Sequence, residues 1–323
     1  MIKIQKIKET DWYLNEIKKL FVHGSTKSNF DDHFYKETED INRELKEFGL
    51  SYNDFSEQKG RTLFEELIVA SYADLQKIFK KIPSETKGLF WRLEKSEKGK
   101  TTRKYIGAWE KIYKTYDKFS KNNLNIMIIE KFNIKCCPYC NENFILNRDT
   151  KAMAQLDHFY PRNIYPIFAL CLYNLIPTCY SCNHIKGSKL IGVSPHNQDY
   201  NFDALKISYI PLTADWINNS NEIDISFLYN YDSGGDLIEK NINEMSIAKS
   251  YKFHKEYVQE LLKKAQIYNK EKIQEIKYSF PDLFSNEEEI FRIIFGNYIE
   301  GIDLGRRPLS KLTKDILEEL KII

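Results

Sequence analysis

The chain has 323 residues, of which 42% are hydrophobic and 14% aromatic, so it can bury a large core and is not intrinsically disordered. The chain contains 48 Lys and Arg and 46 Asp and Glu, which gives a net charge of +2. Because the excess of positive charge is so small, any nucleic-acid-binding surface must come from clustered cations. A mean hydropathy of -0.52 argues against a membrane protein. The most apolar run, 164–176, is too short to span a bilayer, and residues 1–8 lack the apolar core of a signal peptide. We therefore expect a cytoplasmic protein without a membrane partner.

Residues 1–125 predict a helical N-terminal region. Asp11 is a candidate cap for a first helix, whose apolar residues recur every three or four positions: Leu14, Ile17, Leu20 and Phe21. The same periodicity predicts helices over 62–81 and 104–119. Segment 84–101 is rich in Ser, Thr, Gly and Lys, and predicts a loop or a connection between helices.

The character of the chain changes over 126–200, where cysteines, prolines and Asn-rich turns appear and apolar runs are short. In the third region, 201–323, the sequence Asp232-Ser-Gly-Gly separates two apolar segments and predicts a hairpin near 223–240. Helices are expected over 243–276 and 286–299, and over 310–322 with Ser310 as its cap. The predicted fold is mainly α, with a small metal-bearing module inserted between helical flanks.

All six cysteines lie within about fifty residues of the chain, at positions 136, 137, 140, 171, 179 and 182. Clustered cysteines without an export signal favour a metal over a disulfide framework. Cys137-Pro-Tyr-Cys140 and Cys179-Tyr-Ser-Cys182 form two Cys-x-x-Cys pairs, which predict a closed, structural Zn²⁺ site with four thiolate ligands. The alternative is four ordinary buried cysteines. Cys136 could replace its neighbour as a ligand, and Cys171 is expected to be a small apolar residue.

A second constellation lies between and just after these pairs. It consists of Asp157-His158-Phe-Tyr-Pro161, Tyr173-Asn174-Leu-Ile-Pro177 and Cys182-Asn183-His184-Ile-Lys186-Gly187. In this order and spacing, the segment from about 135 to 190 resembles the HNH endonuclease family in its zinc-stapled form. The resemblance implies a ββα-metal module at 126–200 that hydrolyses phosphodiester bonds, and it says nothing about the flanks.

The resemblance also implies roles for individual residues. His158 matches the family's general base, and a histidine that is neutral near pH 7 suits that task. Asp157 and Asn183 match the ligands of a catalytic Mg²⁺ or Mn²⁺ ion, whose affinity should be weak because many relatives have histidine at the second position. Asn174 matches the residue that orients the loop and the base. We expect substitutions of Asp157, His158 or Asn183 to leave the fold stable.

Cleavage also requires cations that hold the phosphate. Lys186, Lys189 and Arg162 are candidates for nucleic-acid contacts, although each could equally be a solvated surface charge. Two roles are open for His184, a structural one and one near the site. His196 is expected in a turn.

The spacer residues, His158 to Arg162 and Tyr173 to Cys179 among them, are similar to those of HNH nucleases in bacterial anti-phage systems such as the Septu nuclease, which works beside an ATPase. This resemblance implies a defence effector that cuts DNA, with RNA as the alternative, and an ATPase or another defence protein as partner. The competing hypothesis is a zinc-stapled module that binds nucleic acid or protein and has a silent nuclease centre. Helical flanks that allow cleavage only within a partner complex are compatible with either view.

Overall fold

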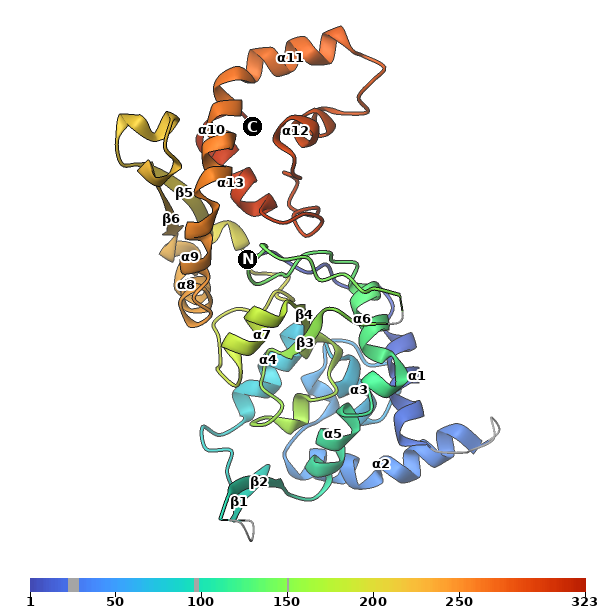
Figure 1. Ribbon diagram of the computed structural model, residues 1–323. Coiled ribbons are helices and arrows are strands. Elements are labelled where there is room, and N and C mark those ends of the chain that lie inside the picture. The colour runs from blue at the N-terminus through green and yellow to red at the C-terminus, as the bar shows by residue number, and fades with distance from the viewer. Residues whose placement is uncertain (23–28, 96–98, 150) are drawn as a thin grey trace.

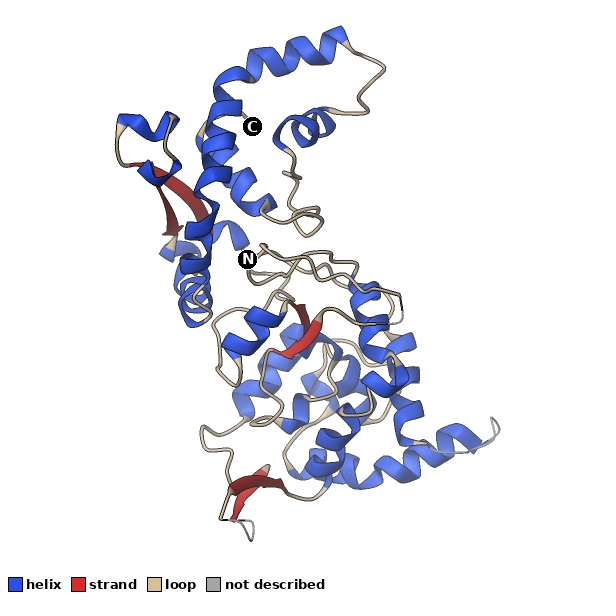
Figure 2. Ribbon diagram, in the orientation of Figure 1, coloured by secondary structure: helices blue, strands red, loops and turns tan. Residues whose placement is uncertain are grey.

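The computed structural model describes residues 1–22, 29–95, 99–149 and 151–323. Helices dominate this part of the chain, and its strands form three separate two-stranded antiparallel sheets (Figure 2). The prediction of a mainly α fold is confirmed. None of the helices in the described part is long and apolar enough to cross a membrane.

The first half of the chain forms the lower part of the molecule in Figure 1. Its elements are α1 (Asp11–Phe21), α2 (Phe30–Glu47), α3 (Leu63–Val69), α4 (Tyr72–Lys81), β1 (Trp91–Lys95), β2 (Thr101–Tyr105), α5 (Ala108–Tyr116), α6 (Leu124–Phe132), β3 (Gln155–His158), β4 (Leu175–Thr178) and α7 (Tyr180–Lys186). The edge-to-face rings of Phe21, Phe34 and Phe64 join α1, α2 and α3 into one core.

The single helix predicted over 62–81 is wrong, because the chain breaks between α3 and α4. Ala70 is extended, with ψ 138°, and the Ser71 side chain accepts a hydrogen bond from the Asp74 amide to begin α4. The first amides of a helix have no partner within the helix, and a capping serine side chain can bind one of them. Ser71 therefore favours the start of a new helix at this point. Apolar residues keep the same spacing across the break, which is why periodicity alone missed it.

The loop predicted at 84–101 and the helix predicted from 104 are also corrected. β1 and β2 pair with each other, with Leu93 opposite Arg103, and α5 starts only at Ala108. The preceding Gly107 adopts φ +52°, and the Ala108 amide donates to the Glu44 carboxylate of α2 at 2.9 Å. The start of α5 is therefore set by a carboxylate from a distant helix, which the local sequence does not reveal.

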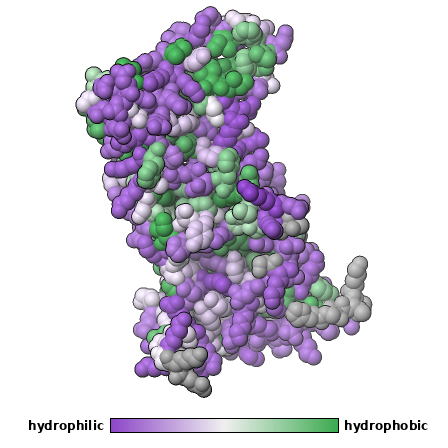
Figure 3. All heavy atoms as spheres, in the orientation of Figure 1, coloured by the Kyte–Doolittle hydropathy of each residue, from purple (hydrophilic) through white to green (hydrophobic). Residues whose placement is uncertain are grey.

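The second half of the chain forms the upper part in Figure 1. It contains β5 (Leu205–Pro211), β6 (Ile223–Tyr229), α8 (Gly235–Glu244), α9 (Ile247–Tyr251), α10 (Lys255–Ile267), α11 (Lys270–Ser279), α12 (Glu287–Phe295) and α13 (Ser310–Glu319). The continuous helix predicted over 243–276 is divided among α8 to α11, with Ser246 in a left-handed conformation at one break. Figure 3 shows a mainly hydrophilic surface with hydrophobic side chains gathered at the upper end.

The predicted hairpin near 223–240 is wrong in its second strand. β6 pairs with β5, so that Ile207 lies opposite Phe227, and the Asp232-Ser-Gly-Gly segment leads into α8. A Cβ on Gly235 would lie 2.7 Å from the Asn230 carbonyl oxygen, so the glycine permits a close approach at the start of a helix. Beyond it, Ile238 and Ile242 are buried four residues apart on one helical face.

Two predicted helix caps are corrected as well. Asp11 is the first residue of α1 rather than its cap, and it forms an ion pair with Arg61. Ser310 is the first residue of α13, and its hydroxyl donates to Asn297 and to the Arg307 carbonyl oxygen. Asp11 is thus bound by a residue distant along the chain, and Ser310 by Asn297 and the nearby Arg307.

Candidate functional site

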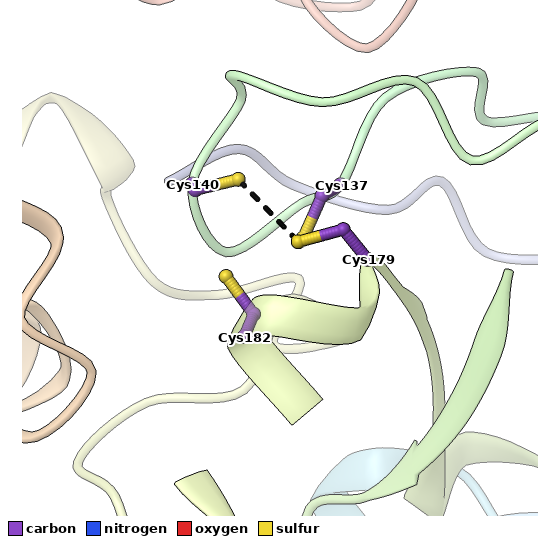
Figure 4. A group of neighbouring side chains, drawn as sticks. All are labelled: Cys137, Cys140, Cys179 and Cys182. Atoms are coloured by element: carbon purple, nitrogen blue, oxygen red, sulfur yellow. Dashed lines mark hydrogen bonds between the residues drawn. The ribbon is translucent and has the colours of Figure 1, made fainter. Parts of the chain in front are cut away.

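The two Cys-x-x-Cys pairs meet in space. Cys137 and Cys140 lie in the loop after α6, while Cys179 precedes α7 and Cys182 lies in its first turn. All four side chains are buried, their sulfurs lie within 4.8 Å of one another, and Figure 4 shows them converging from the loop and the helix. The sequence prediction that these four cysteines form one group is confirmed.

The group fits a tetrahedral metal site. Zn–S bonds of about 2.3 Å place the four sulfurs of such a site about 3.8 Å apart, and the Cys140 and Cys179 sulfurs are 3.9 Å apart. The Asn143 side-chain amide donates to both of these sulfurs at 3.7 Å, which favours their thiolate forms. The four cysteines could therefore hold an ion such as Zn²⁺.

The other two cysteines stand outside this group. Burial raises the pKa of Cys136 to about 12, and it raises the pKa of Cys171 well above its usual value. The Cys171 thiol contacts the Ile167 carbonyl oxygen at 3.8 Å. Neither thiol belongs to the metal-binding group found among the described residues.

The loop that carries Cys137 and Cys140 is bonded to the C-terminal half of the chain. Asn141 adopts φ +57°, its side-chain amide donates to the Leu304 carbonyl oxygen at 3.0 Å, and its side-chain oxygen accepts from the Lys311 amide at 2.9 Å. The Tyr251 hydroxyl donates to the Cys140 carbonyl oxygen at 2.6 Å. The loop that carries Cys137 and Cys140 is thus a junction between the two halves of the molecule.

The Asp157-His158 pair ends a short ribbon beside this metal-binding group. β3 and β4 are antiparallel, with Asp157 opposite Ile176 and His158 opposite Leu175, and α7 follows after Cys179. On β3, Gln155 and Asp157 share one face because alternate strand residues point the same way. On α7, Asn183 and Lys186 lie one turn apart, and they bond Gln155 and Asp157 respectively.

Asp157 is 3% exposed, and both of its carboxylate oxygens have partners. Lys186 Nζ lies 3.0 Å from one oxygen, and the Tyr139 hydroxyl donates to the other at 2.8 Å. Burial raises the pKa of Asp157, and the opposing influences are the charge and hydrogen bond of Lys186 and the bond from Tyr139. The pair is a buried ion pair in the interior of the site.

Carboxylate and amide oxygens are suitable ligands for Mg²⁺ or Mn²⁺. The Asp157 oxygen is held by the Lys186 ammonium, however, and Asn183 bonds Gln155 rather than Asp157. A divalent ion would fit at Asp157 only if Lys186 withdrew.

His158 is buried, and its ring is held on two sides. Nε2 lies 3.0 Å from the Ala169 carbonyl oxygen, which can only accept, so the proton sits on Nε2. Tyr116 of α5 packs against the ring with a centroid distance of 4.5 Å. Burial lowers the pKa of His158 to about 3, so the ring is neutral near pH 7. Within the described part of the chain, no group hydrogen-bonds Nδ1.

Asn174 is fully buried between the ribbon and the loop that follows His158. Its side-chain oxygen accepts from the Tyr160 amide at 2.8 Å, and its amide donates to the carbonyl oxygens of Tyr160 and Phe168 at 3.1 and 3.0 Å. These three bonds fix the loop that carries Ala169, the partner of His158.

The three cations predicted to contact phosphate differ in their exposure to solvent and in their partners. Lys186 has no exposed surface and also donates to the His158 carbonyl oxygen, so its ammonium group is directed into the protein and not toward a phosphate in solvent. Lys189 is half exposed and pairs with Glu244 at 3.0 Å. Arg162 pairs with Asp117 at 2.9 Å and stacks on Tyr116, the ring that also contacts His158.

The other two histidines considered from the sequence, His184 and His196, do not contact His158. His184 is exposed on α7 and stacks on Tyr180 at a centroid distance of 5.5 Å. His196 lies in a turn, as predicted, but it is buried, and its Nε2 lies 3.0 Å from the Leu175 carbonyl oxygen.

Sequence reasoning missed Tyr139 and Tyr116. Tyr139 lies between Cys137 and Cys140, and its position inside this pair was a usable signal. Tyr116 lies about forty residues before His158, and no local pattern marks it.

No family model, curated protein or solved structure matches this chain. The site therefore has to be interpreted from its own geometry and chemistry.

Proposed function

We propose that the protein is an HNH-type endonuclease that hydrolyses phosphodiester bonds in DNA. The observation that carries the proposal is the neutral His158 ring, which is fixed by Ala169 and Tyr116 and whose Nδ1 has no hydrogen-bond partner among the described residues. The ring stands at the end of a ribbon whose following helix is joined to the rest of the site by four cysteines. This arrangement supports a general base next to a structural Zn²⁺ site.

In the proposed reaction, Nδ1 of His158 takes a proton from water as the water oxygen bonds to phosphorus. The bond from phosphorus to the leaving sugar oxygen breaks, and that oxygen receives a proton from solvent. A base with a pKa of about 3 is weak near pH 7. The negative charge of a bound phosphate diester favours the protonated ring, and so raises the pKa of His158 toward the working pH.

The roles of the remaining residues, which contact phosphate or metal, are those that the HNH resemblance implies. Arg162, partly exposed beside Tyr116, is a phosphate ligand in this proposal, exchanging Asp117 for the substrate. Lys189 is a second, outer contact. Asp157 and Asn183 would hold Mg²⁺ or Mn²⁺, which supplies charge stabilisation when bound. Its binding requires Lys186 to leave the Asp157 oxygen.

The test is cleavage of a supercoiled plasmid by the zinc-loaded protein with Mg²⁺, with Mn²⁺ or without either ion. We expect nicking or linearisation by the wild type, and a loss of about 100-fold or more in rate for His158→Ala. His33→Ala is the matched control, because His33 is an exposed histidine on α2. Equal rates for the His158→Ala protein and the wild type would refute the assignment.

A second function is favoured by the Lys186–Asp157 pair. If Lys186 stays on Asp157, the module binds nucleic acid or protein without cutting, or cuts only after a partner rearranges the site. A defence-system protein such as an ATPase is the partner that the motif suggests. DNA binding without cleavage under every metal condition would support this alternative.

A further inference from the structure

A cleft of about 420 Å³ lies apart from the residues around His158. Its walls come from three segments, within 3–7, 131–135 and 302–306. The first segment is extended, the second is the end of α6 and the chain that follows it, and the third precedes α13. The lining includes neither Asp157 nor His158.

The charge of this cleft is strongly one-sided. Its lining includes a single carboxylate, Asp303, and five cations: Lys3, Lys6, Lys131, Lys135 and Arg306. The whole chain has a net charge of only +2, so the cleft concentrates positive charge that the rest of the molecule offsets. Cations gathered in a concave site raise the local concentration of anions.

Most of this charge is not neutralised by the protein. Lys3 Nζ donates to the Gln198 carbonyl oxygen at 2.7 Å, and Lys131 lies 5.7 Å from the Trp12 ring centre, so both have uncharged partners. Arg306 lies 3.5 Å from Asp303, and 47% of the arginine side chain is exposed to solvent. Lys6 and Lys135 form no ion pair with any described residue.

The walls are held by the fold, and two of them are bonded to the metal-binding loop or the residues next to it. The Ile2 amide donates to the carbonyl oxygen of Pro138, between Cys137 and Cys140, at 2.9 Å. The Lys135 amide donates to the Gly305 carbonyl oxygen at 3.0 Å. Met1, Ile2 and Ile4 are buried, and the lysines of the same segment are left at the surface. The backbone segments that carry the cations are therefore held by the fold before any ligand binds.

We propose that this cleft binds the sugar-phosphate backbone of a nucleic acid. The inference rests on the proposed nuclease for the identity of the polyanion, and it adds a binding surface beyond the predicted site residues. A nucleic acid carries one charge per nucleotide, and backbone contacts by Lys and Arg provide affinity without sequence specificity. Five cations on three walls match such a regular anion better than an isolated phosphate.

The test measures binding of the full zinc-loaded chain to a short labelled duplex and to its single strand. Fluorescence anisotropy is recorded over a series of salt concentrations, without Mg²⁺ or Mn²⁺. The cleft variant is Lys131→Glu/Lys135→Glu, and both of these lysines are exposed. The matched control is Lys36→Glu/Lys46→Glu, which makes the same charge change at exposed positions of α2.

We expect the cleft variant to bind about tenfold or more weakly than the wild type, and its salt dependence to be shallower by about one or more phosphate contacts. The control should bind like the wild type. Equal binding by the cleft variant and the wild type would overturn the inference. Wild-type binding to phosphatidylserine vesicles, with no binding to either nucleic acid, would overturn it in favour of a membrane surface.

A second pair, Lys6→Glu/Arg306→Glu, repeats the test from the other walls if the first variant does not fold. The outcome is separable from that of the proposed function, because binding is measured without cleavage. A protein that binds DNA through the cleft but never cuts it would sustain the inference and refute the nuclease. A protein that cuts DNA, but binds it equally well in both cleft variants, would refute the inference and sustain the nuclease.

Discussion

Replacing Lys186 by methionine tests whether the ion pair at the centre of the site is buried. Methionine keeps most of the side-chain length and removes the ammonium group that lies 3.0 Å from Asp157 and 2.8 Å from the His158 carbonyl oxygen. Asp157 would then be a carboxylate that is 3% exposed, with the Tyr139 hydroxyl as its remaining side-chain partner. We expect Lys186→Met to be strongly destabilising.

Removing one partner of a buried ion pair costs about 3–5 kcal/mol, because the other charge stays buried and unpaired. In a chain of this size, 1 kcal/mol shifts Tm by about 2 °C, so a loss of about 6–10 °C is expected. Asp157→Asn should cost a similar amount, since it leaves the Lys186 ammonium unpaired. The buried pair thus leads to a different expectation for Asp157 from the one drawn from the sequence, which was that its substitution spares the fold.

The double variant, Lys186→Met/Asp157→Asn, removes both charges. Its loss of unfolding free energy should be smaller than the sum of the losses in the two single variants. The measurement is urea denaturation of the zinc-loaded proteins, followed by circular dichroism, with the coupling taken from the double-mutant cycle. Lys189→Met is the control. Its half-exposed pair with Glu244 should be worth less than about 1 kcal/mol.

The pH dependence provides an independent check. Without Lys186, the pKa of Asp157 should rise further above its unfolded value, so the folded state binds a proton that the unfolded state releases. The free energy of unfolding of Lys186→Met should then fall as pH rises from about 4, by up to about 1.4 kcal/mol per pH unit. A coupling energy near zero, or a Lys186→Met protein as stable as Lys189→Met, would show that Lys186 is a surface lysine and that this reasoning is wrong.

Other expected outcomes concern the metal group and the support of the base. Cys179→Ser should lose Zn²⁺ in elemental analysis and melt early, because structural zinc contributes apparent binding energies of about 10–16 kcal/mol in small fingers; retained zinc and an unchanged Tm would contradict the four-thiolate site. Tyr116→Leu should lower kcat about 10- to 100-fold with little change in KM, whereas Tyr116→Phe keeps the ring and should cut DNA nearly normally; equal rates for all three proteins would exclude Tyr116 as a positioning residue. His158 and His196, with pKa values lowered to about 3 and about 4 by burial, should make the free energy of unfolding fall as pH drops below 6.5, since the unfolded chain binds protons first. His196→Gln should reduce that slope in denaturation experiments from pH 4 to 7, and an unchanged slope would mean that His196 is not buried in its neutral form.

Local spacing determined much of what the sequence revealed about the site. Each Cys-x-x-Cys pair holds two sulfurs close together because it spans a single tight turn, and the structure brings the two pairs to one point, as predicted. Helical periodicity likewise identified α1, α12 and α13, whose apolar faces depend only on residues three and four apart.

Tertiary contacts decided the features that the sequence left open or misassigned. Whether β6 pairs forward or backward depends on β5, and the start of α5 depends on the Glu44 carboxylate, so turn signals and periodicity misplaced both. The same holds for charge. In the sequence Lys186 was a candidate phosphate contact, but it is the buried partner of Asp157 because α7 packs across β3. Burial and ion pairing depend on groups that are distant along the chain, and only the folded arrangement specifies which groups those are.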